Sequence, residues 1–354
     1  MRIFETIGEM GHEQVILCQD AAAGYRGIIA IHSTVLGPAV GGTRFWNYAS
    51  EDEALTDALR LSRGMTYKCA AAGMPLGGGK SIIIGDNTTK EREKLFRAHG
   101  RFVERLNGRY ITAEDVGTSP SDMELIALET SHVGGLVGKG GDPSPWTGLG
   151  VFRAIQASAK HRWSSDDLRG KRVAIQGCGH VGYNLAKELH AAGARLLVSD
   201  VDPGRVKRAV DEFDAVALSA DEIYAADADV FAPCALGGTI NDQTVPRLKT
   251  EIVCGAANNQ LLENRHGDAL EARGILYAPD YIANAGGVLS GGADLFEWPF
   301  ERVRSEVLAV YDTLLSVLEI AKTEGIPTYK AADRLAERRL REGIDQSACV
   351  KRSS

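Results

Sequence analysis

The residues best suited to chemistry lie in two glycine-rich stretches, one in each half of the chain. Residues 73–86, GMPLGGGKSIIIGD, run three glycines into Lys80, and residues 172–182, RVAIQGCGHVG, space their glycines as GxGxxG. A lysine set among small and apolar residues is a candidate for a shifted pKa. A GxGxxG turn that follows a strand and opens a helix is typical of a dinucleotide site. The sequence therefore predicts a titratable site early in the chain and a nucleotide site later.

The second stretch has the context that the dinucleotide motif requires. Gly177 allows the tight turn, Gly179 lets the backbone approach a pyrophosphate, and Gly182 lets helix and strand pack closely. The N–H groups of Cys178, His180 and Val181 lie in the same turn, where the helix start favours phosphate. The next strand ends at Asp200, whose carboxylate can accept hydrogen bonds from both ribose hydroxyls and would repel a 2′-phosphate. We therefore expect NAD rather than NADP; the alternative is a strand–helix turn that binds nothing.

The first stretch resembles a phosphate-binding P-loop, GxxxxGK[ST], only at its end. Gly79, Lys80 and Ser81 match, but Met74 stands where the first glycine belongs. The residues after the lysine, SIIIGD, predict a strand, whereas a P-loop lysine opens a helix. We interpret the glycines as a tight turn around a ligand, with Lys80 at the mouth of the strand.

Lys68 and Asp115 are two further charges that could act with Lys80. Lys68 precedes CAAAG at the end of a predicted helix, and Asp115 follows the predicted strand YITAE. The plain alternative for each is a solvated surface charge.

The elements that must position these residues indicate an α/β protein of two domains. In the first part we predict strands at 13–19, 25–32, 81–85 and 110–114, a helix beginning at Ser50 with a Ser50–Glu53 capping box, and a helix over 90–106. Residues 134–145 are rich in Gly and Pro and predict a loop and domain boundary. After it, strands alternate with helices, which predicts a doubly wound parallel sheet. Two helices, 301–323 and 328–341, close the chain.

Composition excludes several classes of protein. The formal net charge of −7 argues against nucleic acid as a partner, and no run of about 18 apolar residues predicts a membrane span. The beginning MRIFETIGEM has no signal-peptide pattern, so we expect a cytoplasmic protein. Cysteines and histidines are scattered without close pairs, and we expect no metal.

Longer segments resemble the amino-acid dehydrogenases of the glutamate/leucine/phenylalanine/valine family, and most of all the leucine dehydrogenase branch. The matching segments include LGPAVGGTRFW, EALTDALRLSRGMTYKCAAAG, LGGGKSIIIGD, GRYITAEDVGT, DVFAPCALGG, GAANNQL and GILYAPDYIANAGGV. The resemblance covers nearly the whole chain. It implies that an L-amino acid, NAD and water give a 2-oxo acid, ammonia and NADH. It also implies an N-terminal substrate domain, a C-terminal Rossmann NAD domain, a cleft that closes between them, and oligomers.

The resemblance assigns roles to individual residues. Lys80 matches the catalytic lysine, Asp115 the carboxylate that relays protons to and from the amino group, and Lys68 the lysine that binds the substrate carboxylate. Beside the nicotinamide and along the cofactor path it places Asn258, Asn259 and Ala235, and on the floor around the substrate it places Gly41, Gly42 and Met65.

The side-chain pocket carried over from the family favours an apolar substrate. Its positions are Val40, Met65, Ala113, Gly134, Val288 and Gly291. Glutamate enzymes place a lysine near the position of Val40, so a dicarboxylate substrate is not expected. Val40, Gly134 and Gly291 are each smaller than the residue usual in leucine enzymes, and a wider pocket could admit an aromatic side chain. We expect leucine or another branched-chain substrate, with phenylalanine or tryptophan as the alternative.

Other classes of function make different demands on the sequence. A P-loop kinase needs the glycine that Met74 replaces, and a 2-hydroxy-acid dehydrogenase usually needs a His–acid pair with an Arg. A non-catalytic NAD-sensing protein gives no reason for Lys68, Lys80 and Asp115 to match together. For the domains we expect residues 1–137 to bind substrate and oligomerise, 138–323 to bind NAD, and 324–354 to pack back on the first domain. A small-molecule substrate and a homo-oligomer are the expected partners.

Overall fold

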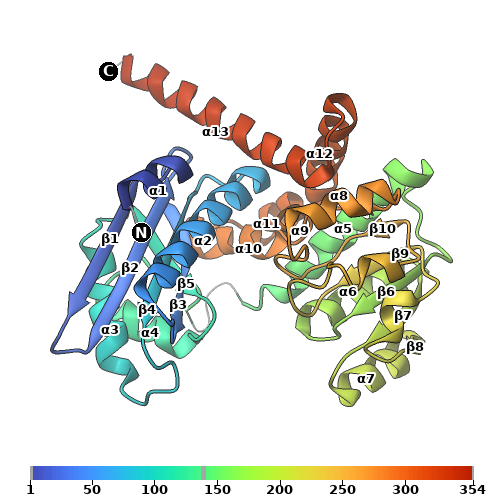
Figure 1. Cartoon of the computed structure of the whole chain (residues 1–354), viewed down its shortest axis with the longest axis horizontal. Coiled ribbons are helices and arrows are strands. Elements are labelled where there is room, and N and C mark those ends of the chain that lie inside the picture. The colour runs from blue at the N-terminus through green and yellow to red at the C-terminus, as the bar shows by residue number, and fades with distance from the viewer. Residues whose placement is uncertain (1–2, 137–140, 353–354) are drawn as a thin grey trace. The chain divides into compact units, whose positions relative to one another are not determined.

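The computed structural model describes residues 3–136 and 141–352, which form two compact units, each built around its own sheet (Figure 1). The first unit comprises residues 1–141, 291–297 and 336–354, and the second comprises 142–290 and 298–335. Helices α10 (Gly286–Phe296) and α13 (Thr328–Arg352) therefore contribute to both units. The predicted boundary between 137 and 138 lies outside the described residues. Of the final segment that we expected on the first domain, 336–354 falls in the first unit and 324–335 in the second.

The first unit has a mixed five-stranded sheet in the order β1-β2-β4-β3-β5. Strand β2 pairs antiparallel with β1 and β4, while β3 runs parallel to both β4 and β5. The strands are β1 Gln14–Asp20, β2 Tyr25–Ser33, β3 Ala39–Trp46, β4 Gly77–Ile84 and β5 Tyr110–Glu114. The helices before and between them are α1 Ile3–Met10, α2 Glu51–Ala72, α3 Arg92–Glu104 and α4 Pro120–Ala127.

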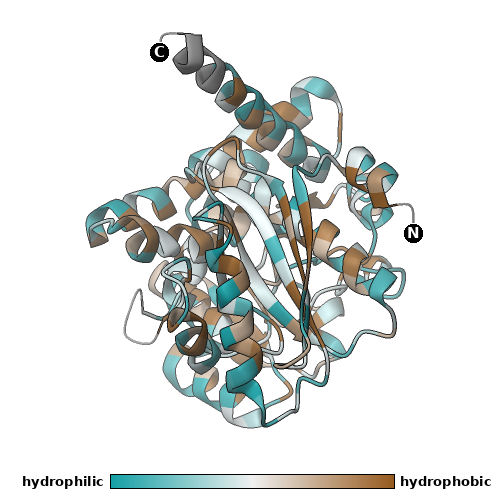
Figure 2. Cartoon of the chain, turned by 90° about the vertical axis from the view of Figure 1, so that its left-hand side faces the viewer, coloured by the Kyte–Doolittle hydropathy of each residue, from teal (hydrophilic) through white to brown (hydrophobic). Residues whose placement is uncertain are grey.

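Helix α2 forms where its cap and its apolar face predict it. The Ser50 side chain accepts from the Glu53 N–H at 3.1 Å, and the helix ends at Gly73, whose φ of 71° suits a residue without a side chain. Leu55, Ala58 and Leu59 pack with Ile28 and Ile82 of the sheet. Figure 2, which views this side of the molecule, shows hydrophobic and hydrophilic residues alternating along the helices. Because α2 covers β2 and β4, it also brings its polar residues to one face of the sheet.

The glycine run before Lys80 does not form a turn, and that part of the sequence interpretation is wrong. Residues 77–79 lie inside β4, and Lys80 is in mid-strand. A Cβ on Gly78 would stand 2.0 Å from the Thr66 nitrogen of α2, and one on Gly79 would stand 2.7 Å from the Tyr110 ring. The glycines are therefore required because helix and strand approach the backbone from both sides. No helix follows the lysine, which agrees with the rejection of a P-loop.

The second unit has a six-stranded parallel sheet in the order β11-β10-β9-β6-β7-β8. Counted from β6, this is the order of a doubly wound Rossmann sheet, which confirms the predicted fold class. The strands are β6 Arg172–Gln176, β7 Arg195–Ser199, β8 Val216–Ala217, β9 Val230–Pro233, β10 Ile252–Val253 and β11 Leu276–Tyr277. Its apolar core includes Ala174, Phe231, Val253 and Leu270.

The helices around this sheet agree with the prediction only in part. Helix α5, Ser144–Trp163, begins inside the expected loop, with Pro145 in its first turn. The predicted helix over 301–323 is divided into α11 (Phe300–Leu308) and α12 (Val310–Glu324), and α13 extends beyond residue 341. The other helices are α6 His180–Ala191, α7 Pro203–Phe213, α8 Asn264–Ala272 and α9 Asp280–Ala283, with single 3-10 turns at Glu222–Ala225 and Val245–Arg247. None of the helices within the described residues has the length and apolar character needed to cross a membrane.

Candidate functional site

Lys80 and Asp115 meet in the first unit as an ion pair. The Lys80 Nζ lies 2.9 Å from Asp115 Oδ2, and the lysine side chain is 5% exposed against 24% for the aspartate. The same Oδ2 accepts from Arg44 Nε at 2.8 Å, and Arg44 in turn bonds Asp57 at 2.8 Å. Two cations thus share one carboxylate, and a second carboxylate compensates the arginine.

The register of the sheet explains why these residues meet. Thr43 pairs with Ser81 and Gly42 with Ala113, so Gly42 lies beside Lys80 on one side and beside Ala113 on the other. Side chains alternate along a strand, which puts Lys80, Gly42 and Ala113 on one face. Asp115 follows β5 on the same sheet, and its N–H is held by Thr118 Oγ1 at 2.9 Å. The lysine therefore lies next to two small residues, Gly42 and Ala113, on the same face of the sheet.

Burial and charge together set the ionisation of the pair. Burial lowers the pKa of Lys80, and Asp115 opposes that change without cancelling it. Burial acts to raise the pKa of Asp115, but Lys80 and Arg44 outweigh it, so this pKa lies below its usual range. The carboxylate is consequently charged at neutral pH, while the lysine releases its proton more readily than a free lysine. A lysine in this condition can act as a general base.

Lys68 and Met65 lie on α2, three positions apart and so on one side of the helix. Both are half-buried. The neighbouring Thr66 packs on Gly78, two residues before Lys80 in β4, which fixes this turn of α2 against the strand. The structure thus holds the part of α2 that carries Lys68 against the strand that carries Lys80.

The predicted pocket positions differ in how much room surrounds them. Gly41 and Gly42 cannot carry a side chain, because a Cβ would meet Gly79 O at 1.8 Å and Glu114 O at 2.6 Å, respectively. A Cβ on Gly134 would make an ordinary contact of 3.6 Å with Leu295 Cδ2, and one on Gly291 would meet nothing. The last two positions can therefore change volume without disturbing the sheet.

The predicted pocket positions do not all belong to one unit. Val40 is buried in β3 and Gly134 donates its N–H to Thr112 O at 2.8 Å, which places it alongside β5. Gly291 belongs to the first unit, but Val288, half-buried in α10, belongs to the second. Leu295 was missed by the sequence argument, since a leucine near the end of a helix carries no chemical signal.

A buried polar network lies under the opposite face of the same strands. Thr43 Oγ1 contacts Ser81 Oγ at 2.7 Å and His99 Nε2 at 3.0 Å, and His99 Nδ1 contacts Tyr25 OH at 2.9 Å. Burial lowers the pKa of His99 to about 3, so the ring is neutral at neutral pH. The network ties β3, β4 and α3 together and fixes the strands that carry Gly42, Lys80 and Arg44.

The three glycines of the second unit have the distinct environments that the motif predicts. Gly177 has φ 97°, and a Cβ on Gly182 would stand 1.9 Å from Gly177 O. A Cβ on Gly179 would meet only Arg205 Nη1, at 3.8 Å. The first and third glycines are thus needed by the fold, while the second leaves open the space in which a pyrophosphate would approach the N-terminus of α6. Cys178 is buried and His180 is exposed in the same turn, with Val181 half-buried.

Asp200 lies at the end of β7 against this turn. Its Oδ2 accepts from the Cys178 N–H at 2.7 Å and its Oδ1 from the Asp202 N–H at 2.9 Å. Arg205 lies 3.9 Å from Asp200 and 3.5 Å from Asp202, so the one cation faces two carboxylates. Asp200, Asp202 and Arg205 together carry a net negative charge, which suits ribose hydroxyls better than a 2′-phosphate.

The other predicted cofactor residues lie on the loops that follow β9 and β10. Ala235 is exposed, and its nitrogen would lie 2.8 Å from a Cβ on Gly177. Asn258 Oδ1 accepts from Asn284 Nδ2 at 2.9 Å, and Asn259 O accepts from the Gly238 N–H at 2.7 Å. The segment that contains Asn284 was quoted in the sequence analysis, but this residue was not named there. Nothing in the sequence indicates that its side chain bonds Asn258. The structure therefore brings the loops after β6, β9 and β10 to one edge of the sheet.

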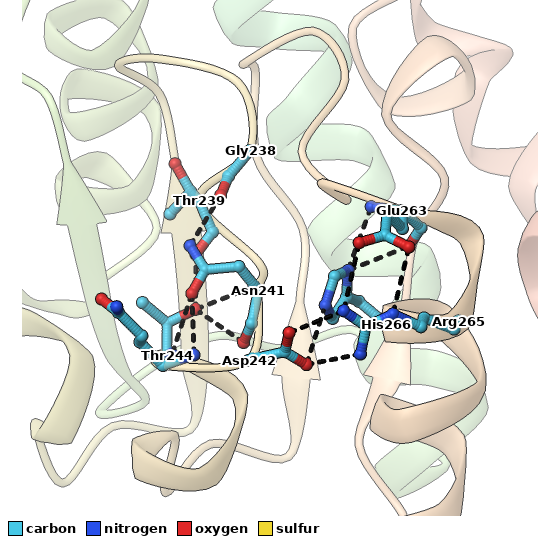
Figure 3. A network of polar contacts seen from close by, with 9 residues as sticks. Gly238, Thr239, Asn241, Asp242, Thr244, Glu263, Arg265 and His266 are labelled. Carbon is cyan, nitrogen blue, oxygen red and sulfur yellow. Dashed lines mark hydrogen bonds and ion pairs between the residues drawn. The ribbon is translucent and has the colours of Figure 1, made fainter.

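A surface network anchors two of these loops (Figure 3). Asp242 lies between Arg265 and His266, with contacts of 2.5 Å to Arg265 Nη1 and 3.3 Å to His266 Nε2. The arginine lowers the pKa of Asp242 to about 2, and Asn241 Nδ2 closes the preceding turn on Gly238 O at 2.8 Å. The segment after Ala235 is thereby held to the start of α8.

Two family profiles match this chain over most of its length. The profile described as the dimerisation domain of Glu/Leu/Phe/Val dehydrogenases matches residues 12–132, and the one described as Glutamate/Leucine/Phenylalanine/Valine dehydrogenase matches 140–206 and 202–346. The chain belongs to the Glu/Leu/Phe/Val dehydrogenase family. The resemblance inferred from the sequence is confirmed, and family membership implies an oxidoreductase that uses a nicotinamide cofactor.

Relatives within the family differ in the substrates that their names state. Leucine dehydrogenase of Thermoactinomyces intermedius is 54% identical over 343 residues, 96% of this chain and 94% of the relative. Phenylalanine dehydrogenase of Caldalkalibacillus thermarum is 47% identical over 347 residues, 96% and 93% of the two chains. The crystal structure of L-tryptophan dehydrogenase from Nostoc punctiforme superposes with a TM-score of 0.90 at 48% identity, covering 96% of this chain and 99% of that one. Family membership therefore establishes the type of enzyme and leaves the substrate side chain open.

Proposed function

We propose that this protein catalyses the reversible, NAD-dependent oxidative deamination of an L-amino acid with an apolar side chain. The products are the 2-oxo acid, ammonia and NADH. The observation that carries the proposal is the buried Lys80 in contact with Asp115 beside Gly42 and Ala113. We propose leucine or another branched-chain amino acid as the preferred substrate, which the identity to leucine dehydrogenases supports. An aromatic substrate is the second candidate, supported by the tryptophan and phenylalanine relatives and by the small Gly134.

Each residue has a defined task in this reaction. Lys68 binds the substrate carboxylate, and Asp115 accepts a proton from the substrate amino group. Bound NAD supplies the acceptor for the hydride that leaves Cα. Neutral Lys80 then takes a proton from the water that attacks the resulting imine, and returning that proton allows ammonia to leave. The lowered pKa of Lys80 supports this role, because the base must be unprotonated before water attacks.

The cofactor site of the proposal lies in the second unit. We assign the pyrophosphate to the backbone N–H groups of residues 177–182, where only Gly179 leaves open space. Asp200 faces the adenosine ribose, and the residual negative charge around it supports NAD. Ala235, Asn258 and Asn259 lie on loops at the same sheet edge and are assigned to the nicotinamide side. For the first unit we propose a role in assembling a homo-oligomer, which the description of its matching profile supports.

The test is NADH formation with a panel of L-amino acids, comparing the wild-type protein with Lys80→Ala and with Lys94→Ala as the control. Lys94 is an exposed lysine of α3, so its loss should change nothing. Turnover by the wild type and the control that falls by at least about 100-fold in Lys80→Ala supports the reaction class. NADH binding without turnover on any amino acid would contradict it and favour an NAD-sensing protein. The ranking of leucine, valine, phenylalanine and tryptophan decides the side chain.

A further inference from the structure

Arg44 is a charged residue of the candidate site that the sequence analysis did not single out. It lies in β3 two residues after Gly42, on the same face of the sheet, and its side chain is 23% exposed. Its Nε donates to Asp115 Oδ2 at 2.8 Å and its Nη1 donates to Asp57 Oδ2 at 2.8 Å. Tyr48 OH donates to the same Asp57 oxygen at 2.6 Å. The guanidinium is thus fixed at both ends.

The contacts of Asp115 are unevenly divided between its two oxygens. Lys80 Nζ at 2.9 Å and Arg44 Nε at 2.8 Å both lie on Oδ2. Among the described residues, no hydrogen bond falls on Oδ1, while Oδ2 accepts one from Arg44. The contacts of Arg44 and Lys80 with Oδ2 restrict rotation of the carboxylate, and Thr118 holds the backbone N–H of the same residue. Oδ1 therefore stays available for an outside donor.

We propose that Arg44 is the positioning residue of this site: it anchors Oδ2 of Asp115 so that Oδ1 is the oxygen that accepts the proton of the substrate amino group. This inference rests on the proposed function. Lys80 alone cannot hold Oδ2, because the lysine must lose its proton during turnover and its bond to the carboxylate weakens at that step. A guanidinium stays charged throughout, and its planar geometry fixes the direction of the bond.

The charge of Arg44 acts on both titrating groups. The groups that face Asp115 are Lys80 from β4, Arg44 from β3, and Asp57 and Tyr48 through Arg44, with Glu114 adjacent in β5. Arg44 lowers the pKa of Asp115 and also lowers that of Lys80. Loss of its charge therefore raises both values. Activity that needs charged Asp115 and neutral Lys80 then begins at a higher pH.

The test compares Arg44→Gln, Arg44→Lys and a matched control, Arg60→Gln. Arg60 is exposed on α2 and lines the same cavity of about 660 Å³ as Arg44 and Asp57, without an ion pair to Asp115. Arg44→Gln should lower kcat by about 10- to 100-fold, as for a small misplacement of a reacting group, and move the acidic limb of the kcat/KM profile to higher pH. Arg44→Lys should restore the limb, because the charge returns, but only part of kcat. Arg60→Gln should match the wild type.

A second readout does not depend on turnover. The pH dependence of Lys80 acylation by a small amine-reactive reagent, followed by mass spectrometry, reports the lysine pKa directly. It should shift upward in Arg44→Gln and not in Arg60→Gln. If Arg44→Gln does not fold, Asp57→Asn keeps the Asp115 contact while releasing the far end of the guanidinium, and kcat should fall by less than is expected for Arg44→Gln. Because Asp57 raises the pKa of Lys80, its loss should move the acylation profile to lower pH, opposite to the shift expected for Arg44→Gln.

Two results separate the failure of this inference from the failure of the proposed function. An active wild type with Arg44→Gln indistinguishable from Arg60→Gln in kcat, in the acidic limb and in Lys80 acylation overturns the role of Arg44 alone. A wild type that oxidises no amino acid overturns the proposed function, and with it this role, even where the acylation shift is present.

Discussion

The two candidate sites are built by opposite means. In the first unit the chemistry depends on charged side chains, with Lys80 and Arg44 each within 2.9 Å of Asp115 Oδ2. In the second unit it depends on the absence of side chains, since Gly177 and Gly182 let the turn pack closely and Gly179 leaves open space beside the backbone N–H groups. The first site should therefore respond to changes of charge and pH, and the second to added volume.

The largest effect should come from volume added to the turn in the second unit. A Cβ at Gly182 would stand 1.9 Å from Gly177 O, so Gly182→Ala should destabilise the unit by about 1–3 kcal/mol and abolish NADH binding. Gly179→Ala should leave the melting temperature unchanged, because its nearest neighbour is 3.8 Å away, and still weaken NADH binding tenfold or more. Thermal unfolding and NADH fluorescence titration separate the two.

These two glycines form a matched pair, because a Cβ would clash with the backbone at Gly182 but not at Gly179. Each lies in the same short turn, and each variant adds a single methyl group. If Gly179→Ala binds NADH as the wild type does, the pyrophosphate does not approach the backbone there. If Gly182→Ala keeps full stability, the close contact of α6 with β6 is not required.

A smaller effect should come from volume added to the first unit, where it changes selectivity and not folding. Gly134→Ala would place a methyl group in contact with Leu295 and should lower kcat/KM for phenylalanine relative to valine by about tenfold. Leu295→Ala removes the side chain that this methyl group would contact, and should raise kcat/KM for phenylalanine relative to valine. Leu128→Ala, at a leucine that is 64% exposed, is the control. An equal loss of kcat/KM for all substrates in both variants would show that Gly134 and Leu295 do not contact the substrate side chain.

The comparison also explains what the sequence could and could not predict. The Rossmann turn was predictable because its motif is local: strand, three glycines, helix and Asp200 follow one another in the chain. Lys80 and Asp115 were singled out by their local sequence and received their roles from the family resemblance. Arg44 was not singled out, because its importance arises only when β3 and β5 pair. The run of glycines before Lys80 was misinterpreted for the same reason. Thr66 and Tyr110, which make those glycines necessary, are distant in sequence and become neighbours only in the folded sheet.

The smallest effect should come from charge in the second unit, where volume matters most. Asp200→Asn keeps the size of the side chain and an oxygen for one of its two backbone N–H partners, but removes a negative charge near the expected ribose. Two unit charges 4 Å apart in water interact by about 1 kcal/mol, so the preference for NAD over NADP should fall about fivefold. The measurement is kcat/KM for each coenzyme at fixed amino acid, at low and high salt. Since Arg205 becomes available to a 2′-phosphate when Asp200 is neutral, NADP should gain more at low salt. A preference that is unchanged at both salt concentrations would mean that shape, and not the charge of Asp200, selects the coenzyme.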